Sequence, residues 1–230
     1  MIINALIPIR GGSKGIPKKN IKKLNGKMLF EYALDATKQC EFFENIIVSS
    51  DDNEIIDKVI DYRKDYGRIL VDKRPKELAQ DDSKSIDVAK YVLNTYGGDI
   101  LVLINACCPL TQTQDIQNVV KMVLETKADS VVSLVEDFSC HPSKICYLDE
   151  KNKVYNDTEF ETNERQKLDK YYKRNTAIYL ATRRTIITIG TFFGEDTRGY
   201  VMPKERSLDI NDMFDWKIAE FLIQNETSQK

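Results

Sequence analysis

The chain has 230 residues, of which 42% are hydrophobic and 30% charged, and its formal net charge is −2. This length and composition fit a single domain over residues 1–230 better than two smaller ones. The near balance of charge excludes a broadly basic protein, so we expect neither nucleic acid nor membrane as a partner. No apolar run approaches the roughly 20 residues of a membrane span.

The cysteines and the N-terminus indicate a reduced, cytoplasmic protein. The five cysteines are odd in number and show no Cys-x-x-Cys spacing, which argues against a disulfide framework. With a single histidine, His141, a zinc site lacks convincing ligands. The chain opens directly into an apolar segment, without the charged region and cleavage site of a secretory signal.

Short apolar segments alternate with amphipathic ones along most of the chain, which is typical of βαβ units. We therefore predict an α/β fold of three layers, doubly wound, with a mainly parallel sheet covered by helices on both faces. Strands are expected at residues 2–9, 46–50, 69–71, 100–104, 130–135 and 177–181. Helices are expected at residues 28–40, 53–66, 86–96, 116–125 and 214–223. On the last helix, Phe214, Ile218, Phe221 and Leu222 share one face.

Residues 138–175 interrupt this alternation. The segment is polar and too long for a structureless loop in a compact domain. We interpret it as an inserted arm with its own strands, which mediates a homodimer.

The loop after the first strand carries the clearest functional signal. Gly11, Gly12 and Gly15 let the backbone approach a ligand closely and turn N–H groups towards an anion. The first 30 residues hold seven Lys or Arg residues and no acidic one, although the whole chain is net acidic. A triphosphate would explain this local excess of positive charge.

The alternative is a basic surface turn, since glycine patterns alone are weak indicators. The loop lacks the Gly-Lys-Ser/Thr of a Walker A motif and the Gly-x-Gly-x-x-Gly of a dinucleotide fingerprint.

The loop sequence Arg-Gly-Gly-Ser-Lys-Gly-Ile-Pro-x-Lys-Asn at residues 10–20 resembles the signature of the CMP-sialic acid synthetases, the acylneuraminate cytidylyltransferases. The resemblance continues in order at residues 47–51, 74–81, 109–116, 141–144, 165–166, 175–179 and 202–210. It implies a Rossmann-like nucleotidyltransferase fold that transfers a cytidylyl group from CTP to a nonulosonic acid of sialic, legionaminic or pseudaminic type.

The resemblance also assigns roles to individual residues. Catalysis would rest on Arg10, Lys19 and Asp209. The nucleotide would contact Arg10, Gly11, Gly12, Ser13, Lys19, Asn20, Arg74 and Asp81. The sugar would contact Asn105, Lys144, Arg165, Gln166 and Asn175. For each charged residue, the competing interpretation is a solvated surface charge.

The sequence departs from the family at several of these positions. Asn105 replaces a longer Gln, Thr111 replaces an Arg, and Thr176 replaces a Gly beside the expected pocket. The neighbouring Cys107 and Cys108 form either a redox pair or, as we favour, small apolar residues at a buried strand end.

The resemblance also implies that residues 202–210 form a metal-binding strand. Mg²⁺ would be held by Asp209 and Asn211, where the family has two aspartates on alternate strand positions. Asn211 or Asp212 instead caps the last helix in the competing interpretation, with Asp215 in its first turn.

Two other functions stay open. One is a nucleotidyltransferase for another 2-keto sugar acid, such as an octulosonate, or for a sugar phosphate. The other is a nucleotide-binding protein that has lost catalysis, which Asn105 and Asn211 would explain.

Overall fold

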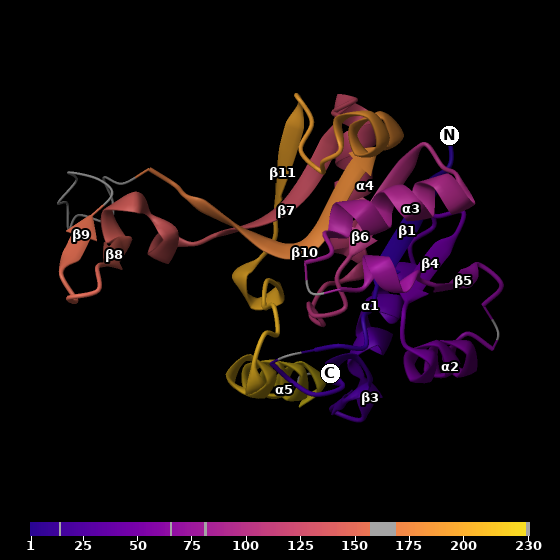
Figure 1. Cartoon of the computed structure of the whole chain (residues 1–230), viewed down its shortest axis with the longest axis horizontal. Coiled ribbons are helices and arrows are strands. Elements are labelled where there is room, and N and C mark those ends of the chain that lie inside the picture. The colour runs from indigo at the N-terminus through magenta and orange to yellow at the C-terminus, as the bar shows by residue number, and fades with distance from the viewer. Residues whose placement is uncertain (14, 65, 81, 157–168, 229–230) are drawn as a thin grey trace.

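The computed structural model describes residues 1–13, 15–64, 66–80, 82–156 and 169–228, with the side chains described up to residue 225. Asp81, Arg165 and Gln166 therefore lie outside the described residues. A seven-stranded sheet with helices on both faces forms the body of the protein, and a thin arm extends from it (Figure 1).

The sheet is mixed but mostly parallel, which confirms the predicted fold class. Only β10 runs antiparallel to its two neighbours, β6 and β7, among the described pairings. In spatial order the strands are β11 (Thr197–Val201), β7 (Ser130–Glu136), β10 (Tyr172–Thr182), β6 (Ile100–Ile104), β1 (Ile3–Pro8), β4 (Ile46–Ser50) and β5 (Ile69–Lys73).

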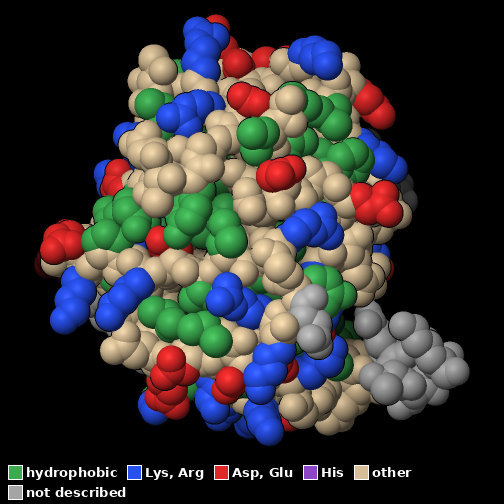
Figure 2. Space-filling model, turned by 90° about the vertical axis from the view of Figure 1, so that its right-hand side faces the viewer, with side chains coloured by type: hydrophobic (Ala, Val, Ile, Leu, Met, Phe, Trp, Pro, Cys, Tyr) green, Lys and Arg blue, Asp and Glu red, His purple; other side chains and the backbone are tan. Residues whose placement is uncertain are grey.

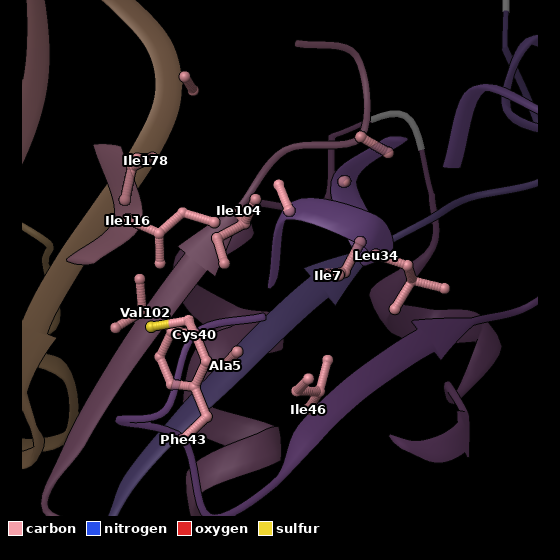
Figure 3. Close-up of a cluster of buried hydrophobic side chains, with 14 of the residues drawn as sticks. Ala5, Ile7, Leu34, Cys40, Phe43, Ile46, Val102, Ile104, Ile116 and Ile178 are labelled. Carbon is pink, nitrogen blue, oxygen red and sulfur yellow. The ribbon is translucent and has the colours of Figure 1, made fainter. Parts of the chain in front are cut away.

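The central strands are buried on both faces, so their side chains divide between two cores. Ala5 and Ile7 of β1 face one core, while Leu6 between them faces the other. Figure 3 shows the first core, where side chains of β1, β4 and β6 meet Leu34 and Ile116. This double burial explains why the strands are continuous apolar runs.

Four helices cover these faces, and a fifth packs near the loop after β1. They are α1 (Leu29–Lys38), α2 (Asn53–Tyr62), α3 (Ser85–Tyr96), α4 (Thr113–Thr126) and α5 (Met213–Ser228). A two-stranded hairpin of β2 (Lys23–Leu24) and β3 (Lys27–Met28) leads into α1.

On α5 the predicted face is not the one that packs. Phe214 is 72% exposed and Phe221 is 64% exposed, whereas Trp216 and Ala219 are buried. The buried residues pack against Ile16 of the loop after β1. Helix α5 therefore lies against this loop and leaves the other apolar face open.

The segment between β7 and β10 leaves the body as the arm, which extends sideways from the sheet (Figure 1). Its described part contains a small hairpin of β8 (Cys146–Leu148) and β9 (Val154–Asn156). The last residues of the predicted excursion belong to β10 instead, because this strand begins at Tyr172.

Residues 202–210 are not a strand, so this part of the sequence interpretation was wrong. Strand β11 ends at Val201, and a short 3-10 turn follows at Lys204–Arg206. Beyond β11 the backbone leaves the edge of the sheet towards α5, so it no longer forms the hydrogen bonds of a strand. Asp209 and Asn211 therefore do not share a strand face.

Figure 2 shows the face formed by the right-hand side of Figure 1, where positive and negative side chains intermingle around small apolar areas.

Candidate active site

The loop after β1 owes its path to two glycines that approach other segments closely. A Cβ atom on Gly11 would lie 2.4 Å from a carboxylate oxygen of Asp52, and one on Gly15 would lie 2.2 Å from the carbonyl oxygen of Asn211. The backbone N–H of Gly11 also donates to Asp51 Oδ1 at 3.1 Å. These contacts seat the loop between the end of β4 and the segment before α5.

Gly12 differs from these two, because no atom lies within 4 Å of the position of its Cβ. The residue is exposed. It faces open space at the tip of the loop, so a ligand can approach the protein backbone there without a steric clash.

The loop residues predicted for the nucleotide come together around one small cavity. Its volume is about 140 Å³, and it is lined by Pro8, Arg10, Ser13, Lys19, Asn20, Asn105, Ala106 and Cys107. The Lys19 ammonium donates to the carbonyl oxygen of Ile210 at 2.6 Å, and Asn20 Nδ2 donates to the carbonyl oxygen of Arg10 at 3.0 Å. The cavity thus offers two cationic side chains and a hydroxyl on a loop that the fold holds in place.

Arg74 does not line this cavity. Its guanidinium is buried and donates to the backbone oxygen and the hydroxyl of Ser49 at 2.6 and 3.2 Å. Burial lowers the pKa of Arg74, against the opposing effect of Asp51 and Asp72. The geometry makes Arg74 a support for the ends of β4 and β5.

A second cavity of about 300 Å³ adjoins the first. It is lined by Ser85, Leu103, Asn105, Arg174, Thr176, Tyr179, Phe192 and Phe193. The rings of Tyr179 and Phe192 lie 5.7 Å apart, and the Arg174 guanidinium lies 5.3 Å from the ring of Phe193. An aromatic wall with one cation suits a ligand that has both an apolar face and an acid group.

Asn105 lines both cavities, so they meet at this residue. It follows β6 directly, and its Nδ2 donates to the carbonyl oxygen of Thr176 at 2.5 Å. Its backbone N–H donates to the carbonyl oxygen of Ala177 at 3.0 Å. Asn105 therefore stands at the carboxyl end of a central strand, the usual ligand position in such sheets.

Thr176 has an unusual backbone conformation next to this junction. Its φ angle is 62°, in the left-handed region that a β-branched residue rarely adopts. Its hydroxyl donates to Asp209 Oδ2 at 3.0 Å. The position was noted in the sequence for its bulk, but this hydrogen bond to Asp209 had no sequence signal.

One carboxylate oxygen of Asp209 accepts no hydrogen bond from the described residues. Oδ1 is buried and has no hydrogen-bond partner among the described residues. The thiol of Cys107 lies beside it, and the neighbouring Cys108 thiol, burial and Asp209 together raise the pKa of Cys107 well above its ordinary value. An orphaned carboxylate oxygen is the kind of group that accepts a hard cation such as Mg²⁺.

Asn211 and Asp212 are occupied differently. The Asn211 amide donates to the backbone oxygen of Asp209 at 3.3 Å and is exposed. Asp212 caps α5, since its Oδ1 accepts from the backbone N–H groups of Phe214 and Asp215 at 2.8 and 3.0 Å. Asp215 in turn accepts from the N–H of Asn211. The structure thus gives Asp212 the capping role, whereas Asp209 has a buried oxygen without a partner among the described residues.

Of the other predicted sugar residues, the two that the structure describes, Asn175 and Lys144, do not line either cavity. Asn175 is buried, and its amide bonds Ser133 at 2.6 Å and Ser207 at 2.9 Å. Lys144 lies on the arm, with its ammonium 4.0 Å from the ring centre of Phe138. Asn175 therefore holds neighbouring segments together at the edge of the larger hollow that Asp209 also lines, and Lys144 lines neither of the two cavities of its own chain.

A buried ion pair holds the segment that carries Asp209. Arg206 donates to both oxygens of the fully buried Asp115 at 3.0 and 2.7 Å, and the pair raises the pKa of Arg206. Tyr200 donates to the same carboxylate at 3.1 Å. This contact ties the N-terminus of α4 to the segment after β11 and was not expected from the sequence.

Fold and site together define an α/β protein with a glycine-rich loop at the carboxyl ends of its strands, where Arg10 and Lys19 line a small cavity. The profile of the cytidylyltransferase family matches residues 4–211, and the chain belongs to this family. Within the described residues, no helix has the length and apolar character needed to cross a bilayer.

Comparison with individual proteins agrees with this assignment. The chain is 33% identical over 233 residues to an N-acylneuraminate cytidylyltransferase of Escherichia coli O18:K1:H7, with 99% of this chain covered, and it spans only 54% of that protein's length. It is 31% identical to a CMP-N,N'-diacetyllegionaminic acid synthase of Legionella pneumophila, with 97% of each chain covered. A solved CMP:2-keto-3-deoxy-manno-octonic acid synthetase complexed with CTP has the same fold, with a TM-score of 0.73 at 13% identity over 98% of this chain and all of that one.

Proposed function

We propose that this protein transfers the cytidylyl group of CTP to a nonulosonic acid of the sialic, legionaminic or pseudaminic type. The products are a CMP-sugar and pyrophosphate. The observation that carries this proposal is the meeting of two unlike cavities at Asn105, one cationic and one walled by aromatic rings. The names of the similar proteins support a cytidine nucleotide and an acidic nine-carbon sugar.

The division of labour follows from the two cavities. The triphosphate of CTP binds at the loop, where Arg10 and Lys19 neutralise its oxygens and the hydroxyl of Ser13 donates a hydrogen bond to them. The sugar binds in the second cavity, where Arg174 supplies a cation for its carboxylate and the aromatic residues contact its apolar face.

The reaction is a displacement at the α-phosphorus. The anomeric hydroxyl of the sugar forms the new O–P bond, the bond to the pyrophosphate oxygen breaks, and the hydroxyl proton passes to solvent. No covalent bond to the protein forms, so the side chains orient the two substrates and stabilise charge. Mg²⁺, when bound, would add positive charge at the phosphate oxygens, and Asp209 Oδ1 is the oxygen of this chain available to hold it.

Pyrophosphate release tests the proposal. Each of the four nucleoside triphosphates is combined with sialic, legionaminic and pseudaminic acids, an octulosonate and a sugar 1-phosphate, all with Mg²⁺. We expect release only with CTP and a nonulosonic acid. Release only with a sugar 1-phosphate or the octulosonate, or no release with any pair, would overturn it.

We further propose a homodimer in which the arm docks on a second copy. The arm exposes apolar side chains, with Tyr147, Leu148 and Val154 at 56%, 58% and 58% exposure. The body offers a hollow of about 630 Å³ beside Asp209, which Ile218 and Leu222 of α5 line together with Lys173 and Lys204. A second copy would also bring Lys144 of the arm to a substrate cavity, which its own chain does not.

Light scattering with arm variants tests the dimer. Wild type should have the mass of two chains, and Leu148→Asp should reduce it to one. Ile60→Asp is the matched control, since Ile60 is 42% exposed on α2, away from the arm. A monomeric, fully active wild type would contradict the proposal.

We also infer that the protein acts in the cytoplasm, which its five free thiols support because a reducing compartment keeps cysteines unpaired.

A further inference from the structure

Two adjacent cysteines and Asp209 form a cluster at the end of β6. Cys107 and Cys108 lie shortly after the strand, beyond Asn105 and Ala106, while Asp209 comes from the segment before α5. The two sulfur atoms and a carboxylate oxygen all lie within 4.8 Å of one another. No zinc-ligand spacing is visible in the sequence because the cysteines and Asp209 are about 100 residues apart.

The three atoms have the character and arrangement of a soft-metal site. Ligand atoms of a tetrahedral Zn²⁺ ion, with bonds of about 2.0–2.3 Å, lie roughly 3.3–3.8 Å apart. The separations of at most 4.8 Å in the structure exceed the upper end of this range by no more than about 1 Å, so small side-chain rotations would bring the three atoms to ligand distances. Asp209 also contributes a buried oxygen with no partner among the described residues, so binding an ion there breaks no hydrogen bond of that atom.

The cluster can be reached from two sides. Cys107 lines the small cationic cavity, and Asp209 lines the larger hollow beside α5. Cys108 is buried behind them and contacts Thr176 and the backbone oxygen of Asn175, each at 3.7 Å. A cation can therefore enter, and water can complete a four-coordinate shell from the hollow.

We propose that Cys107, Cys108 and Asp209 form a binding site for a soft divalent cation of the Zn²⁺ or Cd²⁺ type. On binding, each thiol forms a bond to the metal through sulfur and releases its proton to solvent. Two thiolates and one carboxylate then surround a charge of +2. Thiolate ligands select this class of ion over Mg²⁺, which takes oxygen ligands.

The site would make the enzyme sensitive to such ions. This consequence, unlike the binding itself, rests on the proposed function, because the soft ion would occupy the Asp209 oxygen that Mg²⁺ uses. Zn²⁺ is then expected to inhibit cytidylyl transfer in competition with Mg²⁺.

Direct binding tests the site without reference to activity. The full chain is titrated with Cd²⁺, with no nucleotide present, and the ultraviolet charge-transfer band of Cd–thiolate bonds is followed. We expect one Cd²⁺ per chain with a strong band. Cys107→Ser should weaken binding by at least about 10²-fold, because loss of a direct ligand should cost no less than loss of a residue that only orients a ligand.

Cys146→Ser is the matched control, because this cysteine is exposed on the arm. It should leave the affinity and the band unchanged. Loss of binding in Cys146→Ser, or unchanged binding in Cys107→Ser, would overturn the proposal, as would wild type that shows no band at micromolar Cd²⁺.

X-ray absorption at the zinc edge gives a second readout on wild type, independent of whether any variant folds. Two sulfur neighbours at about 2.3 Å are expected, and a shell of oxygen and nitrogen alone would refute the site. In the transfer assay, Cys107→Ser should raise the Zn²⁺ concentration for half-inhibition relative to Cys146→Ser. Equal inhibition of both variants would remove the inhibitory consequence, whereas an inactive wild type that still binds Cd²⁺ would count only against the proposed function.

Discussion

Lys19 and Ile210 lie 191 positions apart in the chain, yet the ammonium of Lys19 donates a hydrogen bond to the carbonyl oxygen of Ile210 at 2.6 Å. The same two segments touch again where Gly15 meets the backbone of Asn211. The loop that we propose to bind the triphosphate and the segment that carries Asp209 are thus one structural unit.

Lys19→Ala should reduce turnover by roughly 10²–10³-fold, the usual size for loss of one charge-stabilising donor. Its free energy of unfolding should fall by only about 1 kcal/mol, since one partly buried hydrogen bond is lost. Steady-state kinetics and chemical denaturation measure the two effects. Lys18→Ala is the control, because Lys18 is exposed and pairs with Glu54; equal losses in both variants would mean that the loop is only a basic turn.

Gly15→Ala should lower both stability and activity. The new methyl group would meet a backbone oxygen, which cannot rotate away, and such overpacking costs about 1–3 kcal/mol. Thermal unfolding measures the effect. Gly12→Ala faces open space and should unfold at the wild-type temperature; an equal drop in both variants would show that the Asn211 contact is not the cause.

Asp209→Asn should abolish most Mg²⁺-dependent activity without lowering stability, because the buried Oδ1 has no partner to lose. Asp212→Ala should do the reverse. It removes the cap of α5 and costs about 1 kcal/mol, with little change in the Mg²⁺ concentration needed for half-maximal rate. Measuring both variants across a Mg²⁺ titration separates the roles, and a shift confined to Asp212→Ala would reverse our assignment.

Thr176→Gly should relieve the left-handed backbone at this position while removing the hydroxyl that orients Asp209. We expect a gain on the order of 1 kcal/mol in unfolding free energy together with reduced activity. Thr176→Ser keeps the hydroxyl and should retain activity. Equal activity in Thr176→Gly and wild type would show that the hydrogen bond to Asp209 does not matter for transfer.

Asp35 should contribute stability that disappears in acid. Burial raises its pKa, but hydrogen bonds from Lys27, Lys38 and Tyr62 outweigh this and lower it overall. A carboxyl with a lowered folded-state pKa stabilises the fold above its unfolded value of about 3.9, and the benefit is lost as pH falls through the folded value. The stability difference between wild type and Asp35→Asn should therefore be constant near neutral pH and shrink below about pH 4. A difference unchanged down to pH 2 would contradict this.

The sheet could be predicted because short apolar segments mark its central strands in the sequence. Residues 100–104 are an apolar run, and residues 46–50 are three apolar residues followed by two serines; both strands are buried, and their predicted and observed bounds agree. The segment 202–210 was misread because local pattern cannot show that the backbone has left the sheet edge; the Asp115–Arg206 pair that holds it spans 91 positions. On α5, both faces are apolar, so periodicity could not choose the one that packs.

The site was predictable in part for the same reason. Arg10, Ser13, Lys19 and Asn20 are close in sequence, and a single loop brings them to one cavity. The aromatic wall of Tyr179, Phe192 and Phe193 comes from a strand and a later turn, and such residues look like ordinary core in a sequence. The predicted roles of the individual residues stay predictions until variants are measured.

The apolar cluster under the loop has a consequence for the order of events during synthesis. Ile16 and Leu24 pack against Ile210 and Trp216, so the loop gains its support only after residue 216 has left the ribosome. At 5–20 residues per second, the roughly 200 residues between them take on the order of 10–40 s to translate. During that interval the nascent chain can form its first strands, but the loop after β1 lacks the apolar residues against which it packs in the finished fold. The loop can therefore take its final shape only late in synthesis, when these two distant parts of the chain meet.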